Sequence, residues 1–285
     1  MRICMASGKG GTGKTTVAVN LALVAGKVQY VDCDVEEPNG HLFLKPKIDS
    51  SYDIGIAVPV LDDELCNKCG ICSKVCEFNA IAVFAKSVLI YPELCHGCGA
   101  CIHLCPRRAL RESTRCIGVV ERGHIGDIAF LHGILKIGEP LAPPLIRALK
   151  KDFSEKIPVI IDAPPGTSCP VVATMRNSDY VVLVTEPTPF GLNDLKLAVA
   201  LTEELSLPAG VVINKTRNGD NDSIEQFCEE KNLPVLIKLP FDRAIATLYS
   251  QGKNFIENPK YAQLFKELFK KIRKEYDETA CNHKR

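Results

Sequence analysis

The chain has 285 residues, 46% of them hydrophobic and 24% charged, which fits a globular protein with one large domain and at most a small insert. Its 35 lysines and arginines almost balance its 34 aspartates and glutamates, so the net charge of +1 gives no case for binding nucleic acid or an anionic membrane surface. The sequence contains no apolar run of membrane-spanning length and no recognisable signal peptide, and we therefore expect a cytoplasmic protein that does not bind membranes.

The chain opens with the pattern of a βαβ unit. An apolar strand over 1–5 is followed by a glycine-rich loop over 8–16, a helix over 17–25 and a strand over 28–32. The same alternation returns later, with strands expected at 116–121, 159–162, 180–185, 210–213 and 235–239, and helices at 143–151, 191–205, 222–231, 242–251 and 260–276. These strands are continuous apolar runs, so we predict an α/β fold with a mostly parallel sheet that is covered on both faces.

Short turns rich in cysteine interrupt this alternation between about residues 60 and 113. We therefore predict that residues 1–59 and 114–285 form one α/β domain and that residues 60–113 form a small inserted α+β domain.

The glycine-rich loop fits the phosphate-binding pattern G-x-x-x-x-G-K-[ST], since it follows a strand and opens a helix. Backbone N–H groups of such a loop surround phosphate oxygens, and the helix N-terminus adds partial positive charge. Lys14 is expected to contact the β- and γ-phosphates, and Thr15 is expected to hold Mg²⁺. The predicted nucleotide-binding residues of this loop are Gly8, Gly10, Gly11, Thr12, Gly13, Lys14, Thr15 and Thr16.

Lys9 gives the loop a second lysine, so that residues 9–15 fit K-G-G-x-G-K-[ST]. The chain here resembles the deviant Walker A superfamily of P-loop ATPases, which includes MinD, ParA, ArsA and the nitrogenase iron protein. The resemblance implies ATP binding and hydrolysis by a nucleotide-dependent homodimer. It also implies that Lys9 reaches across the dimer to the nucleotide of the partner, in the manner of an arginine finger.

Acidic residues at two strand ends match further positions of this superfamily. Carboxylates at the C-terminal edge of an open α/β sheet lie beside the phosphate site. By resemblance, Asp34 positions the attacking water, Asp32 lies near Mg²⁺, and Asp162 holds Mg²⁺ through water. Gly166 would sense the γ-phosphate.

Two later positions resemble the segments that contact the adenine base. Asn214 follows an apolar strand and is expected to bind the ring, although a capping or turn role is an open alternative. Pro240 begins a segment that resembles the one closing over the base.

Eight of the 14 cysteines form two runs with the spacing of a bacterial two-cluster ferredoxin. In this pattern the fourth cysteine of each run binds the other cluster, which predicts two [4Fe–4S] clusters. Zinc is the rival metal, but its sites usually pair two Cys-x2-Cys knuckles across a longer gap. One predicted cluster uses Cys66, Cys69, Cys72 and Cys105, and the other uses Cys95, Cys98, Cys101 and Cys76.

The combined motifs predict an ATPase that couples nucleotide-driven dimer movement to electron transfer through two clusters, with a redox partner that the sequence does not identify. The alternative is an iron–sulfur assembly or carrier ATPase similar to the Mrp group, but the tail has only one cysteine, Cys281, instead of Cys-x-x-Cys. A membrane-positioning role would need an amphipathic tail, and residues 261–276 are better explained as a packed helix. Cys169, just after the Gly166 segment, is either a buried thiol or a ligand of a cluster bridging two chains.

Overall fold

The computed structural model describes residues 1–219 and 222–282, and its main body is built on one nine-stranded sheet. The strand order is β11-β10-β9-β1-β8-β2-β7-β6-β3, and every neighbouring pair from β11 to β7 is parallel. The expected α/β fold with a mostly parallel sheet is therefore confirmed. The strands are β1 (Arg2–Ala6), β2 (Gln29–Asp32), β3 (Lys47–Leu61), β6 (Leu110–Ile125), β7 (Ile128–Leu135), β8 (Val159–Asp162), β9 (Tyr180–Thr185), β10 (Ala209–Thr216) and β11 (Val235–Pro240).

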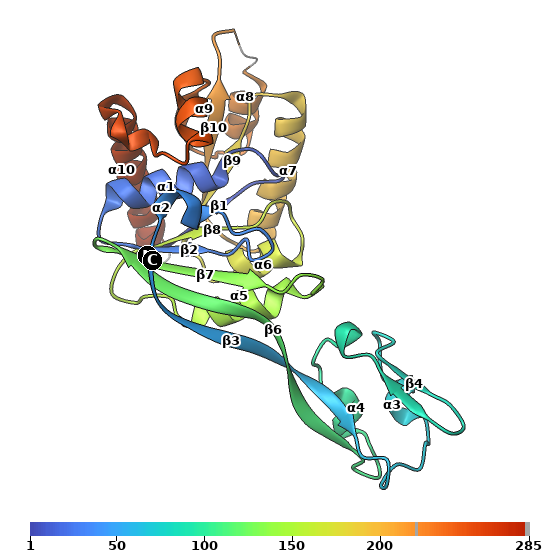
Figure 1. Ribbon diagram of the computed structural model, residues 1–285. Coiled ribbons are helices and arrows are strands. Elements are labelled where there is room, and N and C mark those ends of the chain that lie inside the picture. The colour runs from blue at the N-terminus through green and yellow to red at the C-terminus, as the bar shows by residue number, and fades with distance from the viewer. Residues whose placement is uncertain (220–221, 283–285) are drawn as a thin grey trace.

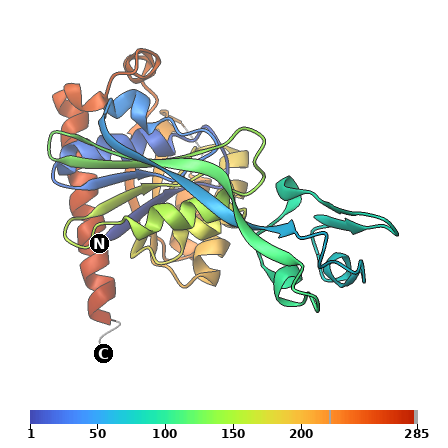
Figure 2. The same cartoon turned by 60° about the horizontal axis from the view of Figure 1, so that its bottom comes forward.

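Helices cover both faces of this sheet (Figures 1 and 2). Because successive strand residues point to opposite faces, Ile3 and Met5 of β1 belong to one buried cluster and Cys4 and Ala6 to another. The first cluster includes side chains from helices α1 (Lys14–Ala25), α2 (Gly40–Leu44), α9 (Arg243–Ser250) and α10 (Pro259–Asn282) and from the 3₁₀ turn η2 (Phe255–Glu257). The second includes α5 (Ala142–Lys151), α6 (Cys169–Met175), α7 (Pro189–Glu204) and α8 (Ser223–Glu230). No helix in the described ranges is both long and apolar enough to cross a membrane.

The antiparallel end of the sheet differs from the expectation. The predicted strand at 116–121 is the middle of the much longer β6, and the strands β3 and β7 were not predicted. The β3–β6 ladder runs from Lys47 opposite His124 to Leu61 opposite Leu110. It leaves the body of the molecule as a long two-stranded arm (Figure 1). The predicted domain boundaries at 59/60 and 113/114 fall inside this continuous arm.

Residues 62–109 form a small unit at the end of the arm (Figure 1). They contain the helices α3 (Ile71–Lys74) and α4 (Ala100–His103), the 3₁₀ turn η1 (Pro92–Leu94), and the antiparallel strands β4 (Ile81–Val83) and β5 (Val88–Ile90). Its small apolar centre includes Ile81, Cys101 and Leu110, the last of which belongs to the arm. We call residues 62–109 the cysteine module.

Candidate functional site

The glycine-rich loop joins β1 to α1, and Lys14 is the first residue of the helix. Gly13 precedes it with φ of 94°, in the left-handed region that side chains disfavour. A Cβ atom on Gly13 would also lie 2.4 Å from the side-chain nitrogen of Asn214. Both the backbone angle and this approach therefore require glycine, and they bring the end of β10 against the loop.

The Lys14 side chain is buried beside the phosphate loop. Its exposed fraction is 7%, and its ammonium group donates a 3.0 Å hydrogen bond to the Ser7 hydroxyl. Burial lowers the pKa of Lys14, while the carboxylates of Asp162 and Asp34 raise it. A charged lysine in this position, with one weak partner, is suited to binding phosphate oxygens.

Asp162 ends β8, is buried, and lies close enough to Lys14 to raise the pKa of that lysine. Its Oδ2 accepts a 3.1 Å hydrogen bond from the Tyr30 hydroxyl, whereas no described residue donates a hydrogen bond to its buried Oδ1. Burial raises the pKa of Asp162 to about 6. A buried carboxylate oxygen without a hydrogen-bond partner is a suitable site for Mg²⁺, because this ion prefers oxygen ligands and retains several waters. The Thr15 hydroxyl is the second candidate ligand.

Asp34 follows β2 and lines the pocket in front of the loop. Burial, and next the negative charge of Asp162, raise the pKa of Asp34 to about 6. Asp32 behaves differently, because its carboxylate accepts backbone hydrogen bonds from Asp34 (3.1 Å), Asn39 (3.1 Å) and Gly40 (2.9 Å). Asp32 thus orders the loop after β2 and is not one of the pocket residues. Its predicted position near Mg²⁺ stays a prediction.

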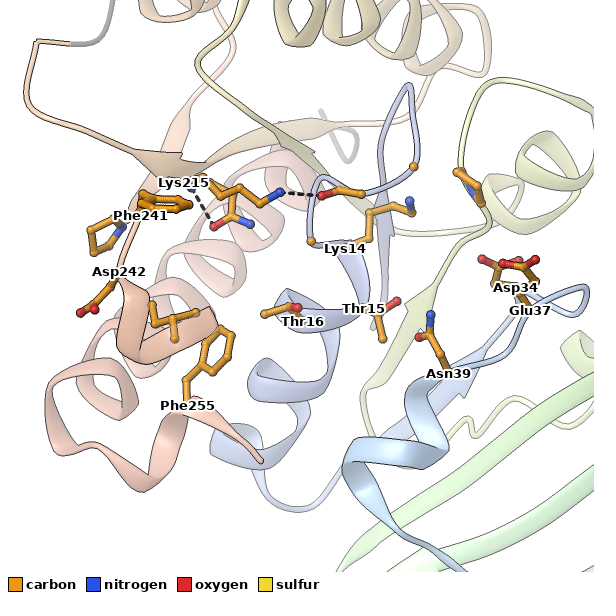
Figure 3. A pocket seen from close by; sticks show the side chains of 17 residues that line it. Lys14, Thr15, Thr16, Asp34, Glu37, Asn39, Lys215, Phe241, Asp242 and Phe255 are labelled. Atoms are coloured by element: carbon orange, nitrogen blue, oxygen red, sulfur yellow. Dashed lines mark hydrogen bonds between the residues drawn. The ribbon is translucent and has the colours of Figure 1, made fainter. Parts of the chain in front are cut away.

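The pocket has a volume of about 500 Å³ and opens between the loop and the segment after β11 (Figure 3). Of the predicted nucleotide and catalytic residues, it is lined by Gly10, Gly11, Gly13, Lys14, Thr15, Thr16, Asp34, Asn214 and Pro240. Gly8, Lys9, Thr12, Asp32 and Asp162 are not among its lining residues in the part of the chain that the structure describes.

Lys215 is a pocket residue that the sequence analysis missed. Its ammonium group donates to the Gly11 carbonyl at 2.8 Å and to the Glu186 carboxylate at 2.9 Å, which ties β10 to the phosphate loop (Figure 3). Lys215 directly follows Asn214, but no motif gave it a role. Phe241 belongs to the segment that begins at Pro240 and was expected to close over the base. It is 45% exposed at the pocket rim, and the Arg217 guanidinium lies 4.2 Å from its ring centroid.

The pocket is also lined by Pro165 and Asp242, which belong to the segments of Gly166 and Pro240 that the resemblance covered. The further pocket residues, which the sequence analysis missed, are Glu37, Asn39, Ile245 and Phe255.

The eight cysteines of the module are divided between two further pockets. One pocket is lined by the predicted first set, Cys66, Cys69, Cys72 and Cys105, and the other by the predicted second set, Cys76, Cys95, Cys98 and Cys101. Burial, and then the neighbouring thiols of the second set, raise the pKa of Cys101 to about 11. In each set one thiol is exposed, namely Cys69 and Cys98.

The two cysteine sets share one local geometry, with an offset of 29 residues between equivalent positions. The thiols of Cys66 and Cys95 accept 3.4 Å hydrogen bonds from the backbone N–H two residues later. Those of Cys76 and Cys105 accept 3.3 Å bonds from the N–H four residues later. A glycine in the left-handed conformation immediately precedes each short helix, Gly70 before α3 and Gly99 before α4.

No three histidine, cysteine or carboxylate side chains in residues 1–219 and 222–282 are grouped closely enough to hold a single metal ion. Cys169 is exposed at the start of α6, and its role as a bridging ligand stays a prediction. His96 lies beside the second cysteine set and stacks on Phe78, with 3.6 Å between ring centroids.

A sequence model of the family described as "CbiA: CobQ/CobB/MinD/ParA nucleotide binding domain" matches residues 3–255. The chain belongs to this family. The chain therefore contains a P-loop ATPase domain of the MinD type. The matched range includes the cysteine module, and the description of the family names only a nucleotide-binding domain.

Individual proteins and one solved structure are also similar to this chain. An uncharacterized protein of Methanocaldococcus jannaschii is 31% identical over 280 residues, covering 96% of both chains. An "Iron-sulfur cluster carrier protein" of Rickettsia conorii is 25% identical over 252 residues, covering 86% of this chain and 62% of its own. The structure of the septum site-determining protein MinD with Mg-ADP from Pyrococcus horikoshii superimposes with a TM-score of 0.57 at 22% identity and 95% coverage of each chain, a similarity of fold.

Proposed function

We propose that this protein is an ATP-hydrolysing iron–sulfur protein whose cysteine module is an inserted ferredoxin-like domain that binds two [4Fe–4S] clusters. The observation that carries the proposal is the division of eight cysteines into two sets of four, each around its own pocket, with the fourth cysteine of each run placed in the other set. That exchange is the ligation pattern of two-cluster ferredoxins.

The repeated hydrogen bonds support the same proposal. Backbone N–H groups directed at sulfur stabilise negative charge on thiolates and on clusters, and they help to set the reduction potential. Equivalent bonds at Cys66 and Cys95, and again at Cys76 and Cys105, imply two sites built for one type of group. Four thiols spread around a pocket suit a four-iron cluster better than zinc, whose four ligands converge on one atom at about 2.3 Å.

The geometry at the phosphate loop supports a different role for each residue in ATP hydrolysis. Lys14 would neutralise the β- and γ-phosphates, and the Thr15 hydroxyl and Asp162 would hold Mg²⁺, which stabilises charge on the phosphates. Asp34, at the pocket wall, would orient the attacking water. Phe241 and Pro240 lie where an adenine ring could pack at the pocket rim.

Lys9 is the residue proposed to act between two chains. It lies in the phosphate loop yet does not line the pocket of its own chain among the residues described. We propose that Lys9 instead serves a second copy, in a homodimer that forms around ATP and is completed by Lys9 of each partner.

An iron–sulfur carrier or assembly role has the stronger support from relatives. The Rickettsia relative bears that function in its name, although this chain spans only 62% of its length. In this role, ATP hydrolysis would drive the release of a cluster to an acceptor protein. The exposed thiols Cys69 and Cys98 give each set one side that an acceptor could reach.

Electron transfer is the second candidate, and the interleaving of the two sets favours it. Because Cys76 and Cys105 are exchanged between the sets, the two clusters would lie side by side in one small module, an arrangement suited to passing electrons. A carrier needs no such pair.

One experiment separates the two roles. Anaerobic holoprotein is incubated with Mg-ATP and an apo-ferredoxin, and the iron in each protein is measured after separation. Iron that moves to the acceptor faster with ATP than with ADP supports the carrier role. Iron that stays bound supports electron transfer if protein whose clusters were first reduced with dithionite, and then freed of excess dithionite, passes electrons to an added low-potential dye faster with ATP than with ADP.

A further inference from the structure

Arg115 and Glu139 form an ion pair where the arm leaves the body. Both guanidinium nitrogens Nη1 and Nη2 of Arg115 donate to the Glu139 carboxylate, one of them at 3.2 Å. The Glu139 side chain is 3% exposed and that of Arg115 is 19% exposed. A bidentate pair with this burial has a fixed geometry, unlike the mobile pairs of a protein surface.

Glu139 belongs to the turn that connects β7 to α5. Its backbone N–H donates to Lys136, and the N–H of Lys136 donates at 2.8 Å to the carbonyl of Ile117. Ile117 is the extra residue of β6 where the β3–β6 register shifts, between Gly118 opposite Ile54 and Cys116 opposite Gly55. This turn thus holds the arm at the irregularity where its ladder register changes.

The second cysteine set rests on the same part of the arm. Arg115 pairs with Ile56, and the next residue, Ala57, accepts a 3.9 Å contact from the Cys95 thiol through its carbonyl. A Cβ atom on Gly97 would approach that carbonyl to 3.1 Å, so the two backbones are in close contact. Ala57 also lines the pocket of the second set, so this part of the arm contacts that set directly.

A series of contacts through α5 and α6 connects this turn to the nucleotide pocket. Pro165 lines the pocket, and α6 begins four residues later. The Lys150 ammonium at the end of α5 donates to the carbonyls of Ala173 (2.8 Å), Thr174 (3.1 Å) and Arg176 at the end of α6. These three bonds join α6 to α5, and α5 follows the turn that carries Glu139.

We propose that the Arg115–Glu139 pair is the joint through which nucleotide acts on the cysteine module, and that it acts on the second set and not on the first. The proposal rests on the function proposed above. A movement of the Pro165 segment on ATP binding would pass through α6, Lys150 and α5 to Glu139, and from there to Arg115 and the chain around Cys95.

Among the residues that the structure describes, the first set has no comparable buried ion pair to the body. Its pocket is lined by Leu61 and Leu110, farther out along the arm. An ion pair of the same kind, between Arg111 of β6 and Asp62, lies at the outer end of the arm, but its arginine side chain is 71% exposed. This pair is a matched control, since an exposed pair transmits little force or field.

The test uses anaerobic holoprotein whose iron content and ATP binding are measured first. Absence of iron or of ATP binding would contradict the proposed function, and it would not test the role of the Arg115–Glu139 pair. Electron paramagnetic resonance of the reduced protein is compared with no nucleotide, with Mg-ADP and with a non-hydrolysable ATP analogue. Cys69→Ala and Cys98→Ala variants, each with one complete set, assign the signals to the two sets. Backbone hydrogen exchange over 95–101 and over 66–72 is the second readout, and it does not require the clusters.

In the unmodified protein, the ATP analogue is expected to shift the signal and slow the exchange at the second set alone. Glu139→Gln should abolish that response while leaving ATP binding unchanged, and Asp62→Asn should retain it. Lys150→Met interrupts the connection within the body, so it decides the question if Glu139→Gln does not fold. Equal responses at both sets, no response at the second set, or a response that survives Glu139→Gln or Lys150→Met would overturn the proposal.

Discussion

The side-chain amide of Asn214 donates a 2.7 Å hydrogen bond to the carbonyl of Thr12, across 202 residues of sequence. This bond fixes the end of β10 against the phosphate loop. The side-chain oxygen Oδ1 of Asn214 in turn accepts a 2.9 Å hydrogen bond from the backbone N–H of Lys215. A residue expected to contact the base therefore also braces the loop that binds the phosphates.

Asn214→Ala should weaken nucleotide binding by loosening that loop. Loss of one such hydrogen bond costs about 1 kcal/mol, or about fivefold in the dissociation constant. Calorimetric titration with Mg-ADP measures the effect, and Gln263→Ala, which removes an exposed amide on α10, is the control. Unchanged affinity in the Asn214 variant would show that the loop holds its shape without this bond.

Asp34→Ala should bind ATP and fail to hydrolyse it, because the substitution removes the group proposed to orient water and leaves the phosphate contacts of Lys14 in place. A positioned acid–base group contributes about 10²-fold or more to the rate. Lys14→Ala is the contrasting variant, which should lose binding itself. Phosphate release and ATP binding measured on both variants test the assignment. Hydrolysis at the normal rate by the Asp34 variant would contradict it.

Lys9→Ala should bind nucleotide in each chain but hydrolyse it poorly, because the lysine is proposed to serve the partner. Mixing this variant with Asp34→Ala is the sharper test. In a mixed dimer, one site combines an intact Asp34 from its own chain with an intact Lys9 from the other, and ATPase activity should partly return. If heterodimers form and remain as inactive as the separate variants, Lys9 does not act between chains.

Phe265→Ala should destabilise the protein strongly, because α10 is packed against the sheet. Phe265 is completely buried, together with Leu268 and Ile272 of the same helix. Truncating a buried phenylalanine costs about 3–5 kcal/mol, which a denaturant titration measures. Phe269→Ala, at a partly buried position of the same helix, should cost less. Equal, small losses would mean that α10 does not depend on this packing.

The sequence allowed the parallel part of the sheet to be predicted, because its strands are uninterrupted apolar runs such as Val159–Asp162 and Tyr180–Thr185. It did not reveal β3, whose first half is polar and largely exposed, as in Lys47–Ser51. Nor did it reveal that β3 pairs with β6, since the module lies between them and pairing depends on contacts distant in the chain.

The site residues that belong to local sequence patterns were predicted, and those that depend on distant contacts were not. The phosphate loop and the cysteine runs are local patterns, and the structure brings their predicted members together. Asp32 was assigned by its place at a strand end, but the backbone N–H groups of the following loop occupy its carboxylate. Arg115 and Glu139 belong to no motif, and only the folded chain shows them in contact.

Iron and acid-labile sulfide, measured on protein reconstituted anaerobically, test the central claim most directly. Two four-iron clusters predict about eight iron atoms and about eight sulfides per chain. Cys69→Ala and Cys98→Ala, each of which disrupts one set, should each lower iron by about half. Stoichiometric zinc without sulfide, or full iron content in both cysteine variants, would contradict the account.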